Sequence, residues 1–148
     1  AMPRIALIDD SRIDRRYTSA CLQEHGWSVD EVLPYQVSQV VAVLHQRIPD
    51  LILLDYSIPG CAGADIARAC ASDRRLAQVP VVIITAHQDP ATTLGIQDLA
   101  PAGVLHKPCK QAALIAMVRN VLDGRPSAPA VRAAGLDPAW EPWTPISA

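Results

Sequence analysis

The sequence predicts an α/β protein in which one parallel sheet is covered by helices on both faces, a doubly wound arrangement. Four short apolar segments without polar–apolar alternation support this prediction: residues 5–8, 51–54, 81–84 and 104–105. Such runs, rich in Val, Ile and Leu, are typical of strands buried on both faces of a parallel sheet. Helix signals follow each run, and this alternation favours right-handed crossovers within a single sheet.

The first two strand–helix units occupy the N-terminal third of the chain. After the run at residues 5–8, Ser11 is a suitable N-cap for a helix that continues to about Glu24 and ends at His25-Gly26. Residues 27–32 are predicted as the second strand. An apolar residue at helical spacing recurs over residues 35–47, which predicts a second helix that stops before a proline.

The boundaries of the remaining units are marked by prolines and a glycine. A proline precedes the fourth strand, another begins the fourth helix, and a glycine follows the last helix. The predicted strands here are residues 51–55, 81–84 and 103–105. The predicted helices are residues 63–71, 90–99 and 110–122.

The composition of the chain favours a globular domain and argues against a membrane protein. The chain has 148 residues, a net charge of -2 and 50% apolar residues, which suits one domain with a substantial core plus an appendage. No segment approaches the roughly 20 apolar residues of a membrane span, and no charged-then-apolar leader begins the chain. The four cysteines form no C-x-x-C pair, and no DNA-binding motif is apparent. We therefore expect a cytoplasmic protein that binds neither membrane nor nucleic acid.

The composition changes after Gly124. Residues 125–148 contain five of the thirteen prolines and two of the three tryptophans, Trp140 and Trp143. We therefore expect a folded domain over residues 1–124 and a Pro-rich tail or linker over residues 125–148. The two tryptophans are expected to pack on apolar surface.

Polar residues with related chemistry follow the apolar runs. Asp9 and Asp10 come after the first run, Asp55 ends the third, Thr85 follows the fourth, and Lys107 comes shortly after the last. Taken singly, the acidic pair also fits a helix N-terminus and the lysine a solvated surface. Because ligands bind at the carboxyl ends of strands in such sheets, their shared placement predicts one site.

This set of side chains suits phosphoryl transfer. Adjacent carboxylates at Asp9 and Asp10 repel each other, and Mg²⁺ relieves that repulsion while leaving room for water and phosphate oxygens. Asp55 is then available as a nucleophile that forms an acyl phosphate. Lys107 and Thr85 are suited to contact the remaining phosphoryl oxygens, since positioning and charge neutralisation dominate this chemistry.

Over roughly residues 3–124 the chain resembles the receiver domain of two-component response regulators, of the kind seen in chemotaxis regulators. The matching motifs are Asp9-Asp10, Asp55-x-x-x-Pro59 with Gly63 eight residues after the aspartate, Thr85-Ala86 and Lys107-Pro108. The resemblance implies a flavodoxin-like five-stranded parallel sheet with strand order 2-1-3-4-5.

The resemblance also implies roles for individual residues. Asp55 would accept a phosphoryl group from a histidine kinase or a histidine phosphotransfer protein. Mg²⁺ would be bound by Asp10, Asp55 and the backbone carbonyl of Ser57, with Asp9 acting through water. The domain would be a signalling phosphoacceptor rather than an enzyme, limited to Mg²⁺-dependent self-phosphorylation from phosphodonors and to autodephosphorylation.

By the same resemblance, Thr85 and Lys107 would contact the phosphoryl group, and the peptide bond before Pro108 would be cis. The family's usual switch pairs the threonine with an aromatic residue three positions before the lysine, and that position is Val104 here. We therefore expect signalling motion in the loop after Thr85. A homodimer is expected through the face of the fourth and fifth helices or through the tail.

Other function classes use parts of this pattern. A haloacid-dehalogenase-type phosphatase also has an Asp nucleophile and Mg²⁺, but it uses Asp-x-Asp after the first strand and needs a cap for which these loops are too short. A flavodoxin-like cofactor carrier needs a phosphate-binding loop where this chain has Asp-Asp-Ser-Arg. A receiver that is one piece of a larger hybrid kinase or effector protein is the third alternative.

Overall fold

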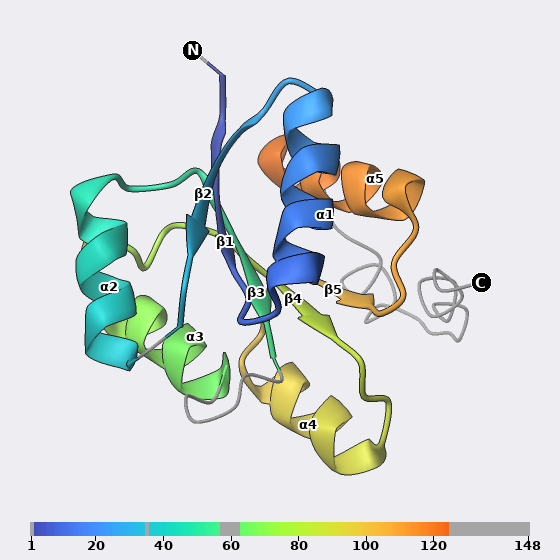
Figure 1. Cartoon of the computed structure of the whole chain (residues 1–148). Helices are drawn as coiled ribbons and strands as arrows, with labels where there is room; N and C mark the ends of the chain where they lie inside the picture. The colour runs from blue at the N-terminus through green and yellow to red at the C-terminus, as the bar shows by residue number, and fades with distance from the viewer. Residues whose placement is uncertain (1, 35, 57–62, 125–148) are drawn as a thin grey trace.

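The computed structural model describes residues 2–34, 36–56 and 63–124, and within them strands and helices alternate as predicted (Figure 1). The strands are β1 (Arg4–Ile8), β2 (Ser28–Val32), β3 (Leu51–Asp55), β4 (Val81–Thr85) and β5 (Gly103–His106). The helices are α1 (Arg12–Glu24), α2 (Val37–Gln46), α3 (Gly63–Ser72), α4 (Pro90–Asp98) and α5 (Gln111–Leu122).

The five strands form one parallel sheet in the order β2-β1-β3-β4-β5, which confirms the predicted fold class and strand order. The first crossover runs from β1 to β2 on one side, and the chain then returns to place β3 on the other side of β1. The register pairs Ile8 with Leu54 across β1 and β3, and Thr85 with His106 across β4 and β5. The residues that follow these strands therefore emerge at one edge.

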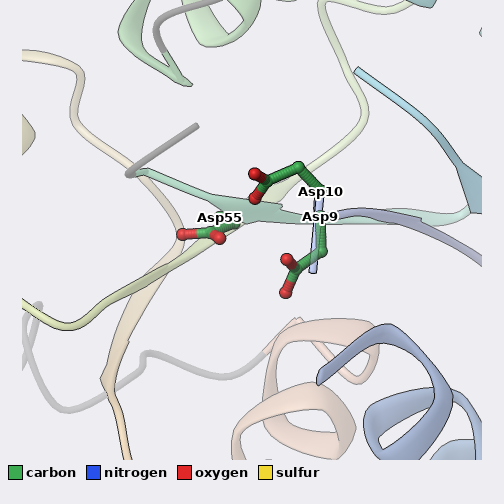
Figure 2. Close-up of side chains that lie close together, drawn as sticks. All are labelled: Asp9, Asp10 and Asp55. Atoms are coloured by element: carbon green, nitrogen blue, oxygen red, sulfur yellow. The ribbon is translucent and has the colours of Figure 1, made fainter. Parts of the chain in front are cut away.

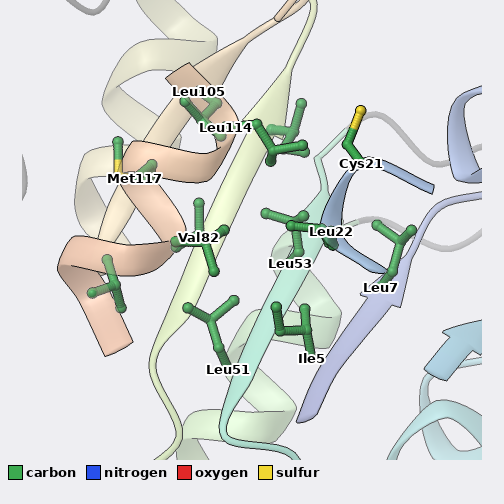
Figure 3. Packing of buried hydrophobic residues seen from close by; sticks show 13 residues of the cluster. Ile5, Leu7, Cys21, Leu22, Leu51, Leu53, Val82, Leu105, Leu114 and Met117 are labelled. Carbon is green, nitrogen blue, oxygen red and sulfur yellow. The ribbon is translucent and has the colours of Figure 1, made fainter. Parts of the chain in front are cut away.

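The strands lie between two helical layers, which explains their lack of alternation. On one face, Ile5 and Leu7 of β1 pack with residues of α1 and α5 such as Leu22 and Met117 (Figure 3). On the other face, Ala6 and Ile8 pack with residues of α2 and α3. Burial of both faces holds the strand ends, and hence the edge that carries the site, in a fixed arrangement.

The predicted helix signals are confirmed at several ends. The Asp14 amide donates to Ser11 Oγ at 3.2 Å, so Ser11 caps α1. Pro90 lies in the first turn of α4, behind the N-cap Asp89. Gly26 and Gly124 follow the ends of α1 and α5 with positive φ angles, where glycine is favoured. Other bounds differ from prediction by a residue or two, as at β5, which extends to His106.

Part of the sequence-based prediction lies outside the described residues, namely Tyr35, the Ser57 and Pro59 positions, Cys61 and the tail at residues 125–148. Cys21 and Cys70 are buried free thiols, and Cys109 is a partly exposed one. Within the described part of the chain, no helix combines the length and apolar character needed to cross a membrane.

Candidate functional site

Three carboxylates meet where the central strands β1 and β3 end. Asp9 and Asp10 follow β1, Asp55 is the last residue of β3, and one ligand oxygen from each lies within 4.8 Å of the others (Figure 2). Asp9 is 2% exposed and Asp55 is 5% exposed, whereas Asp10 faces solvent. The cluster lies at the point where the strand order reverses, the usual ligand position in an open parallel sheet.

The buried carboxylate of Asp9 is costly to ionise in this position. The pKa of Asp9 is raised to about 6, chiefly by burial and also by the charge of Asp55, while a hydrogen bond from the Ser11 amide to Oδ1 at 2.8 Å and the charge of Lys107 oppose the shift. A cation beside the cluster would favour the ionised form. Three carboxylates, two of them buried, are a donor set that fits Mg²⁺.

Lys107 brings a positive charge from the end of β5 to this cluster. Its Nζ lies 3.3 Å from Asp55 Oδ2 and 3.6 Å from Asp9 Oδ2. Burial alone would lower the pKa of Lys107, but a hydrogen bond to Asp14 and the charges of Asp55 and Asp9 raise it above its ordinary value. The ammonium is thus held in its charged form beside Asp55. The Lys107–Pro108 peptide bond is cis, as the resemblance implied.

Thr85 is the last residue of β4 and is completely buried. Its Oγ1 accepts a hydrogen bond from the His87 amide at 3.0 Å, and its hydroxyl lies 3.4 Å from the His87 carbonyl oxygen. The side chain is therefore engaged with the turn that follows β4. Strand register places it at the same edge as Asp55, with Lys107 N donating to the Thr85 carbonyl at 2.8 Å.

Two residues of α1 were not identified from the sequence. Lys107 Nζ lies 2.9 Å from Asp14 Oδ2, and Arg15 Nη1 donates to the Asp9 carbonyl at 2.9 Å while its Nε lies 3.2 Å from Glu31 Oε1. Side chains in a first helical turn point back toward the N-terminus, so they reach the loop that precedes the helix. Asp14 and Arg15 lie three and four residues after the predicted N-cap Ser11, and this position in the first helical turn was the feature of the sequence that could have indicated them.

A groove of about 550 Å³ opens beside the cluster. Asp9, Asp14, Tyr17, Lys107 and Cys109 contribute to its lining. The groove is therefore lined by the Lys107 side chain and by the buried carboxylate of Asp9.

The sequence matches the family model described as the response regulator receiver domain over residues 5–119. The chain belongs to this family. Receiver domains are signalling phosphoacceptors rather than conventional enzymes; they generally bind Mg²⁺ at an acidic pocket and interact with histidine kinases or phosphotransfer proteins. These comparisons do not favour the haloacid-dehalogenase alternative.

Individual relatives agree with this assignment. Protein PilH of Pseudomonas aeruginosa is 28% identical over 123 residues, which cover 83% of this chain and all of PilH. The DNA-binding response regulator MtrA of Mycolicibacterium smegmatis is 32% identical over 128 residues, which cover 86% of this chain and 54% of MtrA. The chain thus spans about half the length of several curated relatives it matches, the phosphate regulon regulator PhoB among them.

One solved structure is similar to this chain in both fold and sequence. The signal receiver domain of a signal transduction histidine kinase from Syntrophus aciditrophicus superposes with a TM-score of 0.75 at 25% identity, covering 82% of this chain and 91% of that one.

Proposed function

We propose that Asp55 accepts a phosphoryl group from a histidine kinase or a histidine phosphotransfer protein and that the domain relays this event by a conformational change. One observation carries the proposal. The buried Asp55 carboxylate has the Lys107 ammonium at 3.3 Å and the oxygens of Asp9 and Asp10 within 4.8 Å. A nucleophile, a cation and two further oxygen ligands therefore share one edge.

In the proposed reaction, an Asp55 oxygen attacks the phosphorus of a phosphohistidine. The O–P bond of an acyl phosphate forms, the P–N bond breaks, and the bonding pair stays on the departing imidazole. Lys107 neutralises part of the charge on the phosphoryl oxygens, and Thr85 hydrogen-bonds to another of them after leaving its partner His87.

Asp9, Asp10, Asp55 and the Ser57 carbonyl are the proposed holders of Mg²⁺, with Asp9 acting through water and Ser57 outside the described residues. When bound there, Mg²⁺ supplies positive charge that offsets the negative charge of the phosphoryl oxygens. Self-phosphorylation from small phosphodonors, and hydrolysis of the acyl phosphate by water, belong to the same proposal. The open groove beside Asp9 and Lys107 supports it.

We assign the receiver to residues 1–124 and a tail or linker to residues 125–148, since the family match ends at residue 119. Relatives of which the match covers only about half support a second arrangement, in which the receiver is one piece of a longer protein. The α4 and α5 helices are the proposed homodimer face. The role of Asp55 is the same in either arrangement.

Intact-protein mass spectrometry tests the proposal. Incubation with acetyl phosphate and Mg²⁺ should add one phosphoryl group to the wild-type chain, and Asp55→Asn should abolish this addition. Asp98→Asn, which removes an exposed carboxylate from the end of α4, is the matched control and should be labelled normally. Asp10→Ala should slow labelling and raise the Mg²⁺ concentration required. Labelling of Asp55→Asn at the wild-type rate would refute the assignment.

A further inference from the structure

The shortest ion-pair contact of the Lys107 ammonium is made with a carboxylate outside the receiver motifs. Nζ lies 2.9 Å from Asp14 Oδ2, compared with 3.3 Å from Asp55 and 3.6 Å from Asp9. Asp14 lies in the first turn of α1 and is separated from Lys107 by 93 positions in the chain. The lysine is thus shared between the proposed phosphoacceptor and an additional acid.

Asp14 is held in this position by the loop that carries the acidic pair. Its amide donates to Ser11 Oγ at 3.2 Å, and the Ser11 amide donates to Asp9 Oδ1 at 2.8 Å. The next residue, Arg15, donates to the Asp9 carbonyl at 2.9 Å. These hydrogen bonds attach the first turn of α1 to Asp9, so the position of the Asp14 side chain depends on the position of Asp9.

A first-turn acid has an ordinary explanation, because the partial positive charge of a helix N-terminus favours a carboxylate there. That explanation accounts for an acid at the start of α1, but not for its contact with an ammonium from the end of β5. An effect on the helix alone would change stability and leave ligand binding at Asp55 unaffected. The two explanations therefore differ in a measurable way.

We propose that Asp14 is a positioning residue that holds the Lys107 ammonium in the resting site and competes with the phosphoryl group for it. This inference rests on the proposed phosphoacceptor function. An ammonium has three N–H donors. Nζ donates hydrogen bonds to Asp14 and Asp55, and Asp9 pairs with it at 3.6 Å. A phosphoryl oxygen would compete with these carboxylates for the ammonium, and Asp14 is the most exposed of the three.

The charge of the cluster points in the same direction. Asp9, Asp14 and Asp55 pair with the Lys107 ammonium, and Asp10 belongs to the same cluster as Asp9 and Asp55. One ammonium and one divalent cation together carry three positive charges against these four carboxylates, so one negative charge is left over. That remaining charge disfavours an incoming phosphoryl group. Neutralising Asp14 removes one negative charge from the cluster and weakens the competing hydrogen bond, because an amide oxygen accepts less strongly than a carboxylate.

Beryllofluoride, an anionic mimic of the phosphoryl group, provides the test. In the presence of Mg²⁺, its affinity is measured for the wild type, Asp14→Asn and Asp65→Asn by following amide shifts. Asp65 is a matched control, because it is an exposed acid in the first turn of α3 that pairs with Arg68 instead of Lys107. We expect Asp14→Asn to bind about two- to fivefold more tightly, the range expected for a partly exposed ion pair, and Asp65→Asn to bind like the wild type.

A double-mutant comparison separates positioning from general electrostatics. In a Lys107→Gln background, the gain in beryllofluoride affinity of Asp14→Asn over Asp65→Asn should be clearly smaller, because only the relief of repulsion remains. Initial labelling rates at low acetyl phosphate concentration give a second readout of the same cycle, usable if beryllofluoride binding to Lys107→Gln is too weak to titrate.

Unchanged or weaker binding by Asp14→Asn would overturn the inference, as would an equal gain in the Lys107→Gln background. The proposed function fails separately: wild-type protein would then not bind beryllofluoride, or Asp55→Asn would bind it equally well. A change in melting temperature of Asp14→Asn with no change in affinity would assign Asp14 to helix stabilisation alone and overturn positioning.

Discussion

The hydroxyl of Tyr56 occupies the space that a side chain at Gly95 would need. A Cβ placed on Gly95 would lie 2.8 Å from the Tyr56 hydroxyl oxygen and 4.0 Å from Cζ of the ring. Tyr56 directly follows Asp55, and its ring packs against the cluster of Ile83, Ile96 and Val104. The ring that packs against this cluster therefore comes from the residue after β3, whereas the usual aromatic position on β5 holds Val104.

Gly95→Ala should destabilise the protein, although alanine is the better helix former. In a helix interior, replacing glycine with alanine ordinarily stabilises by about 0.5–1 kcal/mol. Here the added methyl group would push the packed Tyr56 ring out of its cluster, and this cost should exceed that gain. Urea denaturation gives the free energies of unfolding that decide the sign.

Tyr56→Phe supplies the control for this prediction. Without the hydroxyl, the nearest ring carbon is at 4.0 Å, an ordinary van der Waals distance. In the Tyr56→Phe background, Gly95→Ala should therefore stabilise by up to about 1 kcal/mol. Equal effects of Gly95→Ala in both backgrounds would show that the hydroxyl does not restrict α4.

Gly63→Ala should be more damaging than Gly95→Ala. A Cβ on Gly63 would lie 2.8 Å from the carbonyl oxygen of Asp55 and from Cα and the carbonyl oxygen of Tyr56, all of which belong to the backbone. Backbone atoms cannot rotate away, so we expect a loss of about 1–3 kcal/mol in unfolding free energy. Because Asp55 would move with its backbone, labelling by acetyl phosphate should also slow. Normal stability together with normal labelling would contradict this prediction.

The sheet and the motif positions could be predicted from the sequence because both depend on local patterns. Residues 51–55 form a buried run that ends in Asp55, so the position of this carboxylate at the sheet edge follows from the strand itself. The right-handed crossover rule limits how the strands can be ordered. The order 2-1-3-4-5 followed from resemblance and agrees with that rule.

The contacts that surround the motifs could not be predicted in this way. The Asp14–Lys107 ion pair depends on the direction in which the first turn of α1 faces, and Tyr56–Gly95 depends on where α4 packs on the sheet. Both arise from the three-dimensional placement of a helix, which periodicity does not determine. The valine at position 104 likewise gave no indication in the sequence that the ring of Tyr56 would pack against it.

Phosphorylation should affect the loop after Thr85 more than the strand around Val104. The Thr85 hydroxyl group is engaged with the backbone of His87, so a contact with a phosphoryl oxygen requires the turn to rearrange. NMR amide shift changes on adding beryllofluoride should be larger at residues 85–90 than at residues 103–106. The Asp55→Asn variant should show neither set of changes. Large changes at residues 103–106 with none at 85–90 would contradict the prediction.

Removing residues 126–148 should change either the oligomeric state or the rate of phosphorylation. These residues lie outside the described part of the chain, so the packing of Trp140 and Trp143 remains a sequence-based prediction. Two buried tryptophans would contribute several kcal/mol at about 25 cal/mol per Å², enough to offset part of the entropy lost on ordering. Light scattering, thermal melts and acetyl phosphate labelling of the truncated and full chains are the measurements. Identical mass, melting temperature and rate would identify a passive linker.

The stability of the metal-free protein should depend on pH through Asp9. Burial raises the pKa of Asp9 from 3.8 to about 6, so the native state binds this proton more tightly than the unfolded chain does. The stabilisation is therefore fully present below about pH 4 and is lost as the pH rises through about 6. With EDTA, this group should lower the free energy of unfolding by up to about 3 kcal/mol between pH 4 and pH 7, at 1.36 kcal/mol for each pKa unit.

Asp9→Asn isolates this contribution, because an amide has nearly the same shape and does not titrate. In urea denaturation with EDTA, the variant should lack the decline in stability that the wild type shows between pH 4 and pH 7, and it should be the more stable protein at pH 7. Mg²⁺ should then stabilise the wild type at pH 7 far more than Asp9→Asn, since binding to the native state relieves the repulsion between buried carboxylates. If both proteins show the same pH dependence and the same response to Mg²⁺, the prediction is wrong, and the ionisation of Asp9 does not link Mg²⁺ binding to the stability of the protein.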